Sequence, residues 1–112
     1  MRKTMMVLCI GGLVSTGAAS AATAVLDDTA ALDLMKKDGC STCHSVEKKV
    51  VGPAYHEVAL KHKADKDATA VLEKSVRAGS KGAYGAIPMP PNSVAKITDE
   101  DLHSLVEWIL SK

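Results

Sequence analysis

The residues best suited to chemistry stand together at positions 40–44, where the sequence CSTCH places two thiols and an imidazole side by side. Two cysteines separated by two residues, with a histidine directly after the second, form the pattern of a c-type haem attachment site. In such a site Cys40 and Cys43 each form a thioether to a haem vinyl group, and the imidazole of His44 can bind the iron. We therefore expect one covalently attached haem c, for which the rest of the chain must supply a pocket and a second iron ligand.

Other chemistries use the same residue types. A CXXC pair can be a redox dithiol or half of a zinc site. A zinc site needs further cysteine or histidine ligands at a suitable spacing, but the only other cysteine is Cys9 and there is no second CXXC. A redox dithiol is expected in a βαβ context, and the sequence has no strand-rich pattern. A disulfide between Cys40 and Cys43 would leave His44 without a role.

The first two dozen residues have the layout of a secretory signal peptide. Arg2 and Lys3 form a basic start, residues 5–14 are apolar, and small residues follow as far as position 24. We expect residues 1–21 to be cleaved, with cleavage after residue 24 as the alternative. The apolar run is short for a membrane span, so no stable membrane insertion is expected. The pattern predicts an exported, periplasmic protein.

Residues 22–112 are then left to form one small domain. Loss of Arg2 and Lys3 reduces the basic side chains from 14 to 12, against 13 acidic ones, so the domain is close to neutral. A near-neutral domain does not favour nucleic acid as a partner. With one tryptophan, two tyrosines and no phenylalanine, the core of so short a chain is thin. A buried haem would supply an apolar centre.

Apolar periodicity and end signals predict helices and no strands. The expected ranges are 29–38, 54 to 61 or 62, and 68–78, with a final helix that begins at Thr98. Apolar residues recur at helical spacing in these segments. Residues 80–92 are rich in glycine and proline, and so long a connection in a small domain is expected to have a function. The predicted fold class is all-α, with about four short helices around one haem.

A haem that carries electrons needs a second strong iron ligand, and methionine or histidine is the usual choice. Met89 is favoured because it lies in the sequence IPMPPN, where prolines on both sides fix the backbone and hold the thioether in one place. The alternative is that Met89 is only a buried side chain of a proline-rich loop. Met35 lies on an apolar helix face and is expected in the core. Three histidines compete for the position but are expected at the surface, among charged neighbours: His56, His62 and His103.

These residues together give the chain a resemblance to a small bacterial class I cytochrome c of the cytochrome c-551/c-552 (c8) type. The resemblance extends from about Leu32 to Leu110. It rests on GCSTCH at 39–44, VGPAY at 51–55, GSKGAYG at 79–85, IPMPPN at 87–92 and WIL at 108–110. CXXCH alone indicates only a c-type haem, and the IPMPPN segment makes the resemblance specific to the c-551/c-552 type.

The resemblance implies a role for each residue that matches the family pattern. Cys40 and Cys43 carry the thioethers, and His44 and Met89 are the axial ligands of the iron. The carbonyl oxygen of Pro53 accepts a hydrogen bond from the imidazole of His44, which orients the ring and adjusts its basicity. Covalent haem of this type is added outside the bacterial cytoplasm, which agrees with a signal peptide.

The resemblance also places three residues around the haem. The side-chain amide of Asn92 is expected to donate to the sulfur of Met89, and Trp108 is expected near a haem propionate. Tyr84 stands where the family often has a tryptophan in contact with a propionate, so it keeps one donor with a different reach. Ser75 stands where some relatives have an arginine against a propionate. These departures affect the propionate contacts and leave the iron ligands unchanged.

The resulting prediction is a periplasmic carrier of single electrons and not an enzyme. Methionine opposite histidine raises the reduction potential relative to two histidines, and with both axial positions filled no substrate reaches the iron. We expect a monomer that docks weakly and transiently around the haem edge. The resemblance implies membrane cytochrome complexes as donors, and terminal oxidases, nitrite reductases or peroxidases as acceptors.

Several lysines are candidates for a basic rim that would steer acidic partners: Lys36, Lys37, Lys48, Lys49, Lys61, Lys63 and Lys81. Two other functions would use the same cofactor. A haem enzyme or gas sensor would need Met89 to be displaced easily, which the rigid PMPP segment disfavours. A structural haem subunit of a larger complex would be recognised by stable co-purification with a partner.

Overall fold

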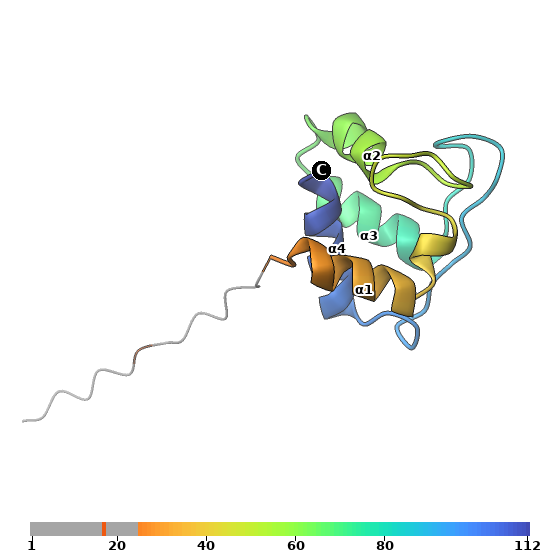
Figure 1. Ribbon diagram of the computed structural model, residues 1–112. Coiled ribbons are helices and arrows are strands. Elements are labelled where there is room, and N and C mark those ends of the chain that lie inside the picture. Colours follow the sequence, from red (N-terminus) through yellow and green to blue (C-terminus); the bar gives the residue numbers. More distant parts are fainter. Residues whose placement is uncertain (1–16, 18–24) are drawn as a thin grey trace, which may run out of the picture.

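The computed structural model describes Gly17 and residues 25–112 of the 112-residue chain. The predicted signal peptide, with both expected cleavage positions and Cys9, therefore lies outside the described residues apart from Gly17. The elements are α1 (Asp28–Lys37), the short 3-10 helix η1 (Cys40–Thr42), α2 (Tyr55–His62), α3 (Ala68–Ala78) and α4 (Asp99–Leu110), as Figure 1 shows. Among residues 25–112 there are isolated β-bridges but no strands. The all-α prediction is confirmed.

The helix ends follow from local side-chain chemistry. Asp27 precedes α1, and its Oδ1 accepts a hydrogen bond from the backbone N–H of Ala30 at 2.8 Å. Thr98 precedes α4, and its Oγ1 accepts from the N–H of Asp101 at 3.1 Å. These bonds satisfy N–H groups that have no partner within a first helical turn. The predicted ranges and the observed ones differ by no more than one residue at each end that was predicted.

Helix α4 lies at the centre of the packing and contacts α1, α2 and α3. Its apolar residues recur every three or four positions, so they form one buried stripe: Leu102, Leu105, Val106 and Ile109. Other helices add Met35, Tyr55 and Val58 to the same cluster. No helix within the described part of the chain is long and apolar enough to cross a membrane.

Two long connections carry the residues singled out by the sequence. One links η1 to α2 and contains His44 and Pro53, and the other links α3 to α4 and contains Met89. Both extend to the same side of the helices in Figure 1. Residues of both connections line one cavity. The helices therefore hold the two connections on either side of it.

Candidate functional site

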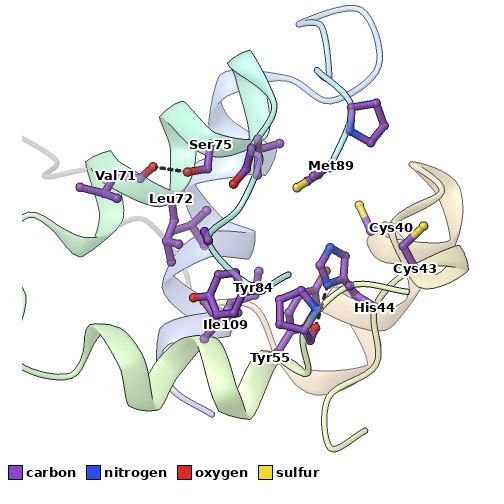
Figure 2. Close-up of a pocket in the computed structure, with 18 of the residues that line it drawn as sticks. Cys40, Cys43, His44, Tyr55, Val71, Leu72, Ser75, Tyr84, Met89 and Ile109 are labelled. Carbon is purple, nitrogen blue, oxygen red and sulfur yellow. Dashed lines mark hydrogen bonds between the residues drawn. The ribbon is translucent and has the colours of Figure 1, made fainter. Parts of the chain in front are cut away.

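The cavity between the two connections has a volume of about 380 Å³ and is lined mainly by apolar side chains. Helices α2, α3 and α4 supply much of this lining, including Val58, Leu72 and Leu105. Figure 2 shows the cavity with Met89 on one side and the cysteines and His44 on the other. An apolar space with a few convergent polar groups is the usual form of a cofactor pocket.

Residues 40–44 form a tight turn beside this cavity. Gly39 has φ +77°, a left-handed conformation that glycine adopts without a steric penalty, and it turns the chain from α1 into η1. The backbone N–H groups of Cys43 and His44 both donate to the carbonyl of Cys40, at 3.1 and 2.9 Å. The turn brings Cys40, Cys43 and His44 together on the cavity wall. Both cysteines are free thiols.

The surroundings of Cys40 bear on the chemistry of the pair. Burial raises the pKa of its thiol, the Asp38 carboxylate raises it further, and the ammonium group of Lys96 partly opposes the shift. A redox-active CXXC thiol has a lowered pKa, because the thiolate is the reactive form. The environment of Cys40 therefore does not favour a redox dithiol. Among the described residues, no group of three or more His, Cys, Asp or Glu is arranged to hold a metal ion.

The imidazole of His44 is held in one orientation by the backbone around it. Its Nδ1–H donates to the carbonyl of Pro53 at 2.9 Å, and this bond leaves Nε2 as the nitrogen free to ligate a metal. Gly52 lies directly against the ring, because a Cβ built on Gly52 would stand 2.6 Å from Cε1 of His44. The N–H of Gly52 also donates to the carbonyl of Cys43 at 2.8 Å.

Tyr55 and Trp108 form an aromatic support behind His44. The ring of Tyr55 stacks on that of His44 at a centroid distance of 5.1 Å, and Trp108 meets Tyr55 edge-on at 6.1 Å. Trp108 is 2% exposed and does not line the cavity, and its Nε1–H donates to Oδ1 of Asp28 at 2.8 Å. The indole donor of Trp108 is thus used by α1, and the expected position of Trp108 near a haem propionate stays a prediction.

Met89 lies across the cavity from His44, as Figure 2 shows. Its backbone forms an antiparallel bridge with Ser80, in which the N–H of each residue donates to the carbonyl of the other, at 2.8 and 3.1 Å. Gly79 permits this bridge, because a Cβ on Gly79 would stand 2.7 Å from the carbonyl oxygen of Met89. The other described methionine, Met35, is 1% exposed in the core and is not among the cavity residues.

Asn92 holds the residues that follow Met89, through hydrogen bonds to backbone carbonyls. Its Nδ2 donates to the carbonyls of Pro90 and Val76 at 3.0 and 3.3 Å, and its backbone N–H donates to Val76 at 2.9 Å. Both hydrogens of the side-chain amide have carbonyl acceptors within reach, and the expected bond to the Met89 sulfur stays a prediction.

Tyr84 and Ser75 line the cavity at the positions where the sequence departs from the family. The hydroxyl of Tyr84 is buried without a protein partner. Its pKa is raised mainly by burial and to a smaller extent by the negative charge of Glu57. The ammonium of Lys61 lies 4.2 Å from the centre of the Tyr84 ring. The hydroxyl of Ser75 donates to the carbonyl of Val71 within α3 at 3.0 Å. Of these two hydroxyls, that of Tyr84 is therefore the one free to donate a hydrogen bond to a bound group.

The competing histidines have partners within the protein. Nδ1 of His56 donates to the carbonyl of Lys112 at 2.7 Å, and Nδ1 of His103 lies 2.6 Å from a Glu73 oxygen. His62 lies at the cavity wall, with Nδ1 at 3.3 Å from a carboxylate oxygen of Asp65. Only His44 combines a wall position with a backbone carbonyl that fixes its ring.

Sequence reasoning did not single out Gly52, Ser80 or Arg77, which hold the site together. The close approach of Gly52 to His44 depends on the folded chain and has no signature in the local sequence. Ser80 and Arg77 act through backbone carbonyls of residues nine or more positions away. No local pattern marks such contacts.

The residues present fit a covalently attached haem. Two thiols line an apolar cavity, and an oriented imidazole faces a thioether across it. The buried hydroxyl of Tyr84 lacks a protein partner. The donor set is the one that c-type haem uses. Cys40 and Cys43 would hold the group, and His44 and Met89 would bind its iron.

Comparison with known proteins shows that the chain is similar to cytochromes c. Residues 30–112 match the family model described as cytochrome c. The chain is 48% identical to a cytochrome c-551 of Pseudomonas denitrificans over 79 residues, which make up 70% of this chain and 93% of that protein. It is 43% identical to a cytochrome c-552 of Nitrosomonas europaea over 98 residues, which make up 88% of this chain and 93% of that protein.

Solved structures give the same result. The crystal structure of wild-type Nitrosomonas europaea cytochrome c552 is similar with a TM-score of 0.67 and 45% identity, over 71% of this chain and 96% of that one. The class 1 cytochrome MtoD from Sideroxydans lithotrophicus is similar with a TM-score of 0.63 and 32% identity, over 76% of this chain and 95% of that one.

Proposed function

The chain belongs to the cytochrome c family, and we propose that it is a periplasmic carrier of single electrons whose haem iron is bound by His44 and Met89. Family membership establishes the coarser part of this statement: the chain is a small all-α class I cytochrome c, a haem-containing electron carrier with haem c attached covalently through the CXXCH motif. The observation that carries the proposed ligation is that His44 and Met89 face each other across the cavity.

The haem, when bound, supplies the ferric/ferrous couple that accepts one electron from a donor and passes it to an acceptor. The protein's own residues keep its surroundings nearly the same in both states. The bond from His44 Nδ1 to Pro53 at 2.9 Å and the stacked ring of Tyr55 fix the imidazole. The Met89–Ser80 bridge fixes the thioether side. A rigid site suits electron transfer because little must rearrange when the charge of the iron changes.

Partner docking is proposed at the cavity mouth, where the haem edge would be exposed. Among the candidate lysines of the basic rim, Lys61 lines the cavity, and its Nζ donates to the carbonyl of Ala83 at 2.8 Å. We propose weak, transient encounters with membrane cytochrome complexes as donors, and with a terminal oxidase, nitrite reductase or peroxidase as acceptor. A monomer suffices for such encounters.

The test of axial ligation is a visible spectrum of the holoprotein, made in a host that attaches haem. We expect the weak far-red ferric band of sulfur bound to iron, and no response of the ferrous form to carbon monoxide. Met89→Ala should remove the band and permit gas binding, whereas Met35→Leu, in the core, should change neither. A wild-type protein without the band that binds carbon monoxide readily would instead indicate a haem enzyme or sensor.

The proposed periplasmic location rests on the predicted signal peptide. Mass spectrometry of the mature protein from a bacterial host tests it directly. We expect a chain that begins at Ala22, or at Val25 for the alternative cleavage, and that is released with the periplasmic fraction. A holoprotein that retains Met1 in the cytoplasmic fraction would contradict the proposed export.

A further inference from the structure

The segment after Met89 has few ways to be held by its own backbone. Pro90 and Pro91 have no N–H and cannot donate hydrogen bonds. The next residue, Asn92, is 7% exposed, and its N–H and side-chain amide are bound by carbonyls, at distances of 2.9 to 3.3 Å. The position of Met89 relative to α3 therefore depends on its backbone bridge to Ser80 and, on the C-terminal side, on how firmly Asn92 is fixed.

Arg77, in the last turn of α3, joins this segment to the start of α4. Its Nη1 donates to the carbonyl of Ile97 at 2.8 Å and to that of Asn92 at 3.3 Å. Its Nη2 lies 2.6 Å from Oδ1 of Asp99. The Arg77 side chain is 23% exposed and that of Asp99 is 82% exposed, so water screens the ion pair. The two carbonyl bonds, which are partly buried, are the stronger contacts.

We propose that Arg77 is a positioning residue for Met89: by fixing the carbonyls of Asn92 and Ile97, its guanidinium holds the loop in the arrangement that faces the thioether toward His44. This inference rests on the proposed ligation by His44 and Met89. The planar guanidinium can donate to both carbonyls and the carboxylate at once. A lysine carries a single ammonium group and would replace only part of this set, so Arg77→Lys should have an intermediate effect.

The same pair of helices offers a matched control. Thr69 Oγ1 donates to a carboxylate oxygen of Glu107 at 2.6 Å, which also joins α3 to α4. Neither residue lines the haem cavity. Loss of this bond through Thr69→Val should weaken the contact between the helices without reaching the Met89 loop. It therefore separates a general loss of stability from a change in the position of Met89.

The test is the binding of imidazole to the ferric holoprotein, because imidazole must displace Met89 to reach the iron. The apparent affinity then reports the fraction of molecules in which Met89 is released. Loss of the charge-assisted bonds through Arg77→Met should raise this affinity about tenfold or more. Arg77→Lys should give a smaller increase, and Thr69→Val should leave the affinity unchanged. Far-UV circular dichroism during unfolding measures the overall stability of each variant.

The inference is overturned if Arg77→Met changes imidazole affinity no more than Thr69→Val does, because Arg77 then only stabilises the fold. If Arg77→Met fails to accumulate as holoprotein, Arg77→Lys against wild type decides, and an unchanged affinity overturns the inference. Met89→Ala separates the two proposals. If Met89→Ala binds imidazole as wild type does, the ligation itself is wrong; if it binds more tightly while the Arg77 variants do not, only the positioning role fails.

Discussion

The side of the cavity that carries His44 and the side that carries Met89 differ in how far along the chain their contacts reach. His44 is fixed by neighbours between residues 40 and 55: its Nδ1 bonds to Pro53, Gly52 lies against its ring, and Tyr55 stacks on it. The same stretch contains the two cysteines that attach the haem. One short segment therefore encodes most of the His44 side.

The Met89 side is assembled from more distant parts. Met89 bridges to Ser80, Asn92 bonds to Val76, and Arg77 reaches to Ile97, which lies twenty residues further along the chain. No link to the haem is expected on this side beyond the proposed bond from the Met89 sulfur to the iron. Local opening costs least where few contacts and no covalent links must be broken. We therefore expect the Met89 side to open before the His44 side under denaturant, heat or a competing ligand.

Gly79→Ala should destabilise the Met89 side of the cavity and have the largest effect on stability. A Cβ at this position meets the Met89 carbonyl oxygen at 2.7 Å, and Gly79 has φ +81°. With ψ at 169°, this backbone conformation is essentially restricted to glycine and costs about 1–3 kcal/mol for alanine. Displacing packed atoms costs about 1–3 kcal/mol more, so we expect a loss of roughly 2–6 kcal/mol of unfolding free energy. Guanidinium unfolding of the holoprotein, monitored by the far-red band and by circular dichroism, measures it.

Gly82→Ala is the matched control for this change. Gly82 has φ +82°, but a Cβ there meets nothing within 4 Å, so only the conformational cost of about 1–2 kcal/mol remains. The far-red band should be lost at lower denaturant concentration in Gly79→Ala than in Gly82→Ala. Equal loss of the band in both variants would show that the close approach to Met89 has no effect on ligation.

Gly52→Ala applies the same kind of change to the His44 side. The added Cβ would stand 2.6 Å from Cε1 of His44, so the ring must move away from the Pro53 carbonyl, at a cost of about 1–3 kcal/mol. The lost hydrogen bond makes the imidazole a weaker donor, which should raise the reduction potential, whereas a weakened Met89 bond in Gly79→Ala should lower it. Spectroelectrochemical titration of both variants measures these shifts. Shifts of the same sign would contradict the division into two sides.

Features that depend on local contacts could be predicted from the sequence. The helix bounds followed from Thr98 and from the apolar spacing in α4, and CXXCH indicated the haem because its chemistry is contained in five residues. Met89 was singled out because its flanking prolines fix the backbone without reference to any other segment. These features needed no knowledge of what packs against them.

Contacts between distant residues were not predicted, because their geometry depends on the assembled fold. Trp108 donates to Asp28, which is eighty positions earlier in the chain. The Asn92 amide turned to the carbonyls of Pro90 and Val76, because the C-terminal end of α3 lies beside it. A residue type shows which bonds a side chain can form, and only the packed structure decides which acceptor lies within reach.

Tyr84→Phe tests whether a third group, beyond the two proposed axial ligands, binds the haem on the Met89 side. The Tyr84 hydroxyl is buried without a protein partner. If it donates to a haem propionate, its removal should lower the stability of the holoprotein by about 1 kcal/mol. Ser75→Ala, which removes a cavity hydroxyl already bonded to Val71, should have less effect. Denaturant unfolding decides, and a stability equal to or above wild type for Tyr84→Phe would exclude the propionate contact.

The smallest effect is expected from Asp28→Asn, which provides a reference away from both sides of the cavity. A hydrogen bond from Lys112, and to a smaller extent one from Trp108, holds the pKa of Asp28 below its ordinary value of 3.8. A group whose pKa is lowered on folding contributes stability above its unfolded pKa, and this contribution is lost as the pH falls through the folded value. The Tm of Asp28→Asn should therefore lie below that of wild type at pH 7, and the difference should shrink below about pH 3.8. Asp33→Asn on the same helix controls for the change in net charge. The far-red band should be unaffected throughout, because the side-chain hydrogen bonds of Asp28 are to Trp108 and Lys112, which lie outside both connections. A band that weakens with Asp28→Asn would mean that Trp108 and Tyr55 transmit support from Asp28 to His44. The His44 side would then depend on more distant residues than its own hydrogen bonds indicate.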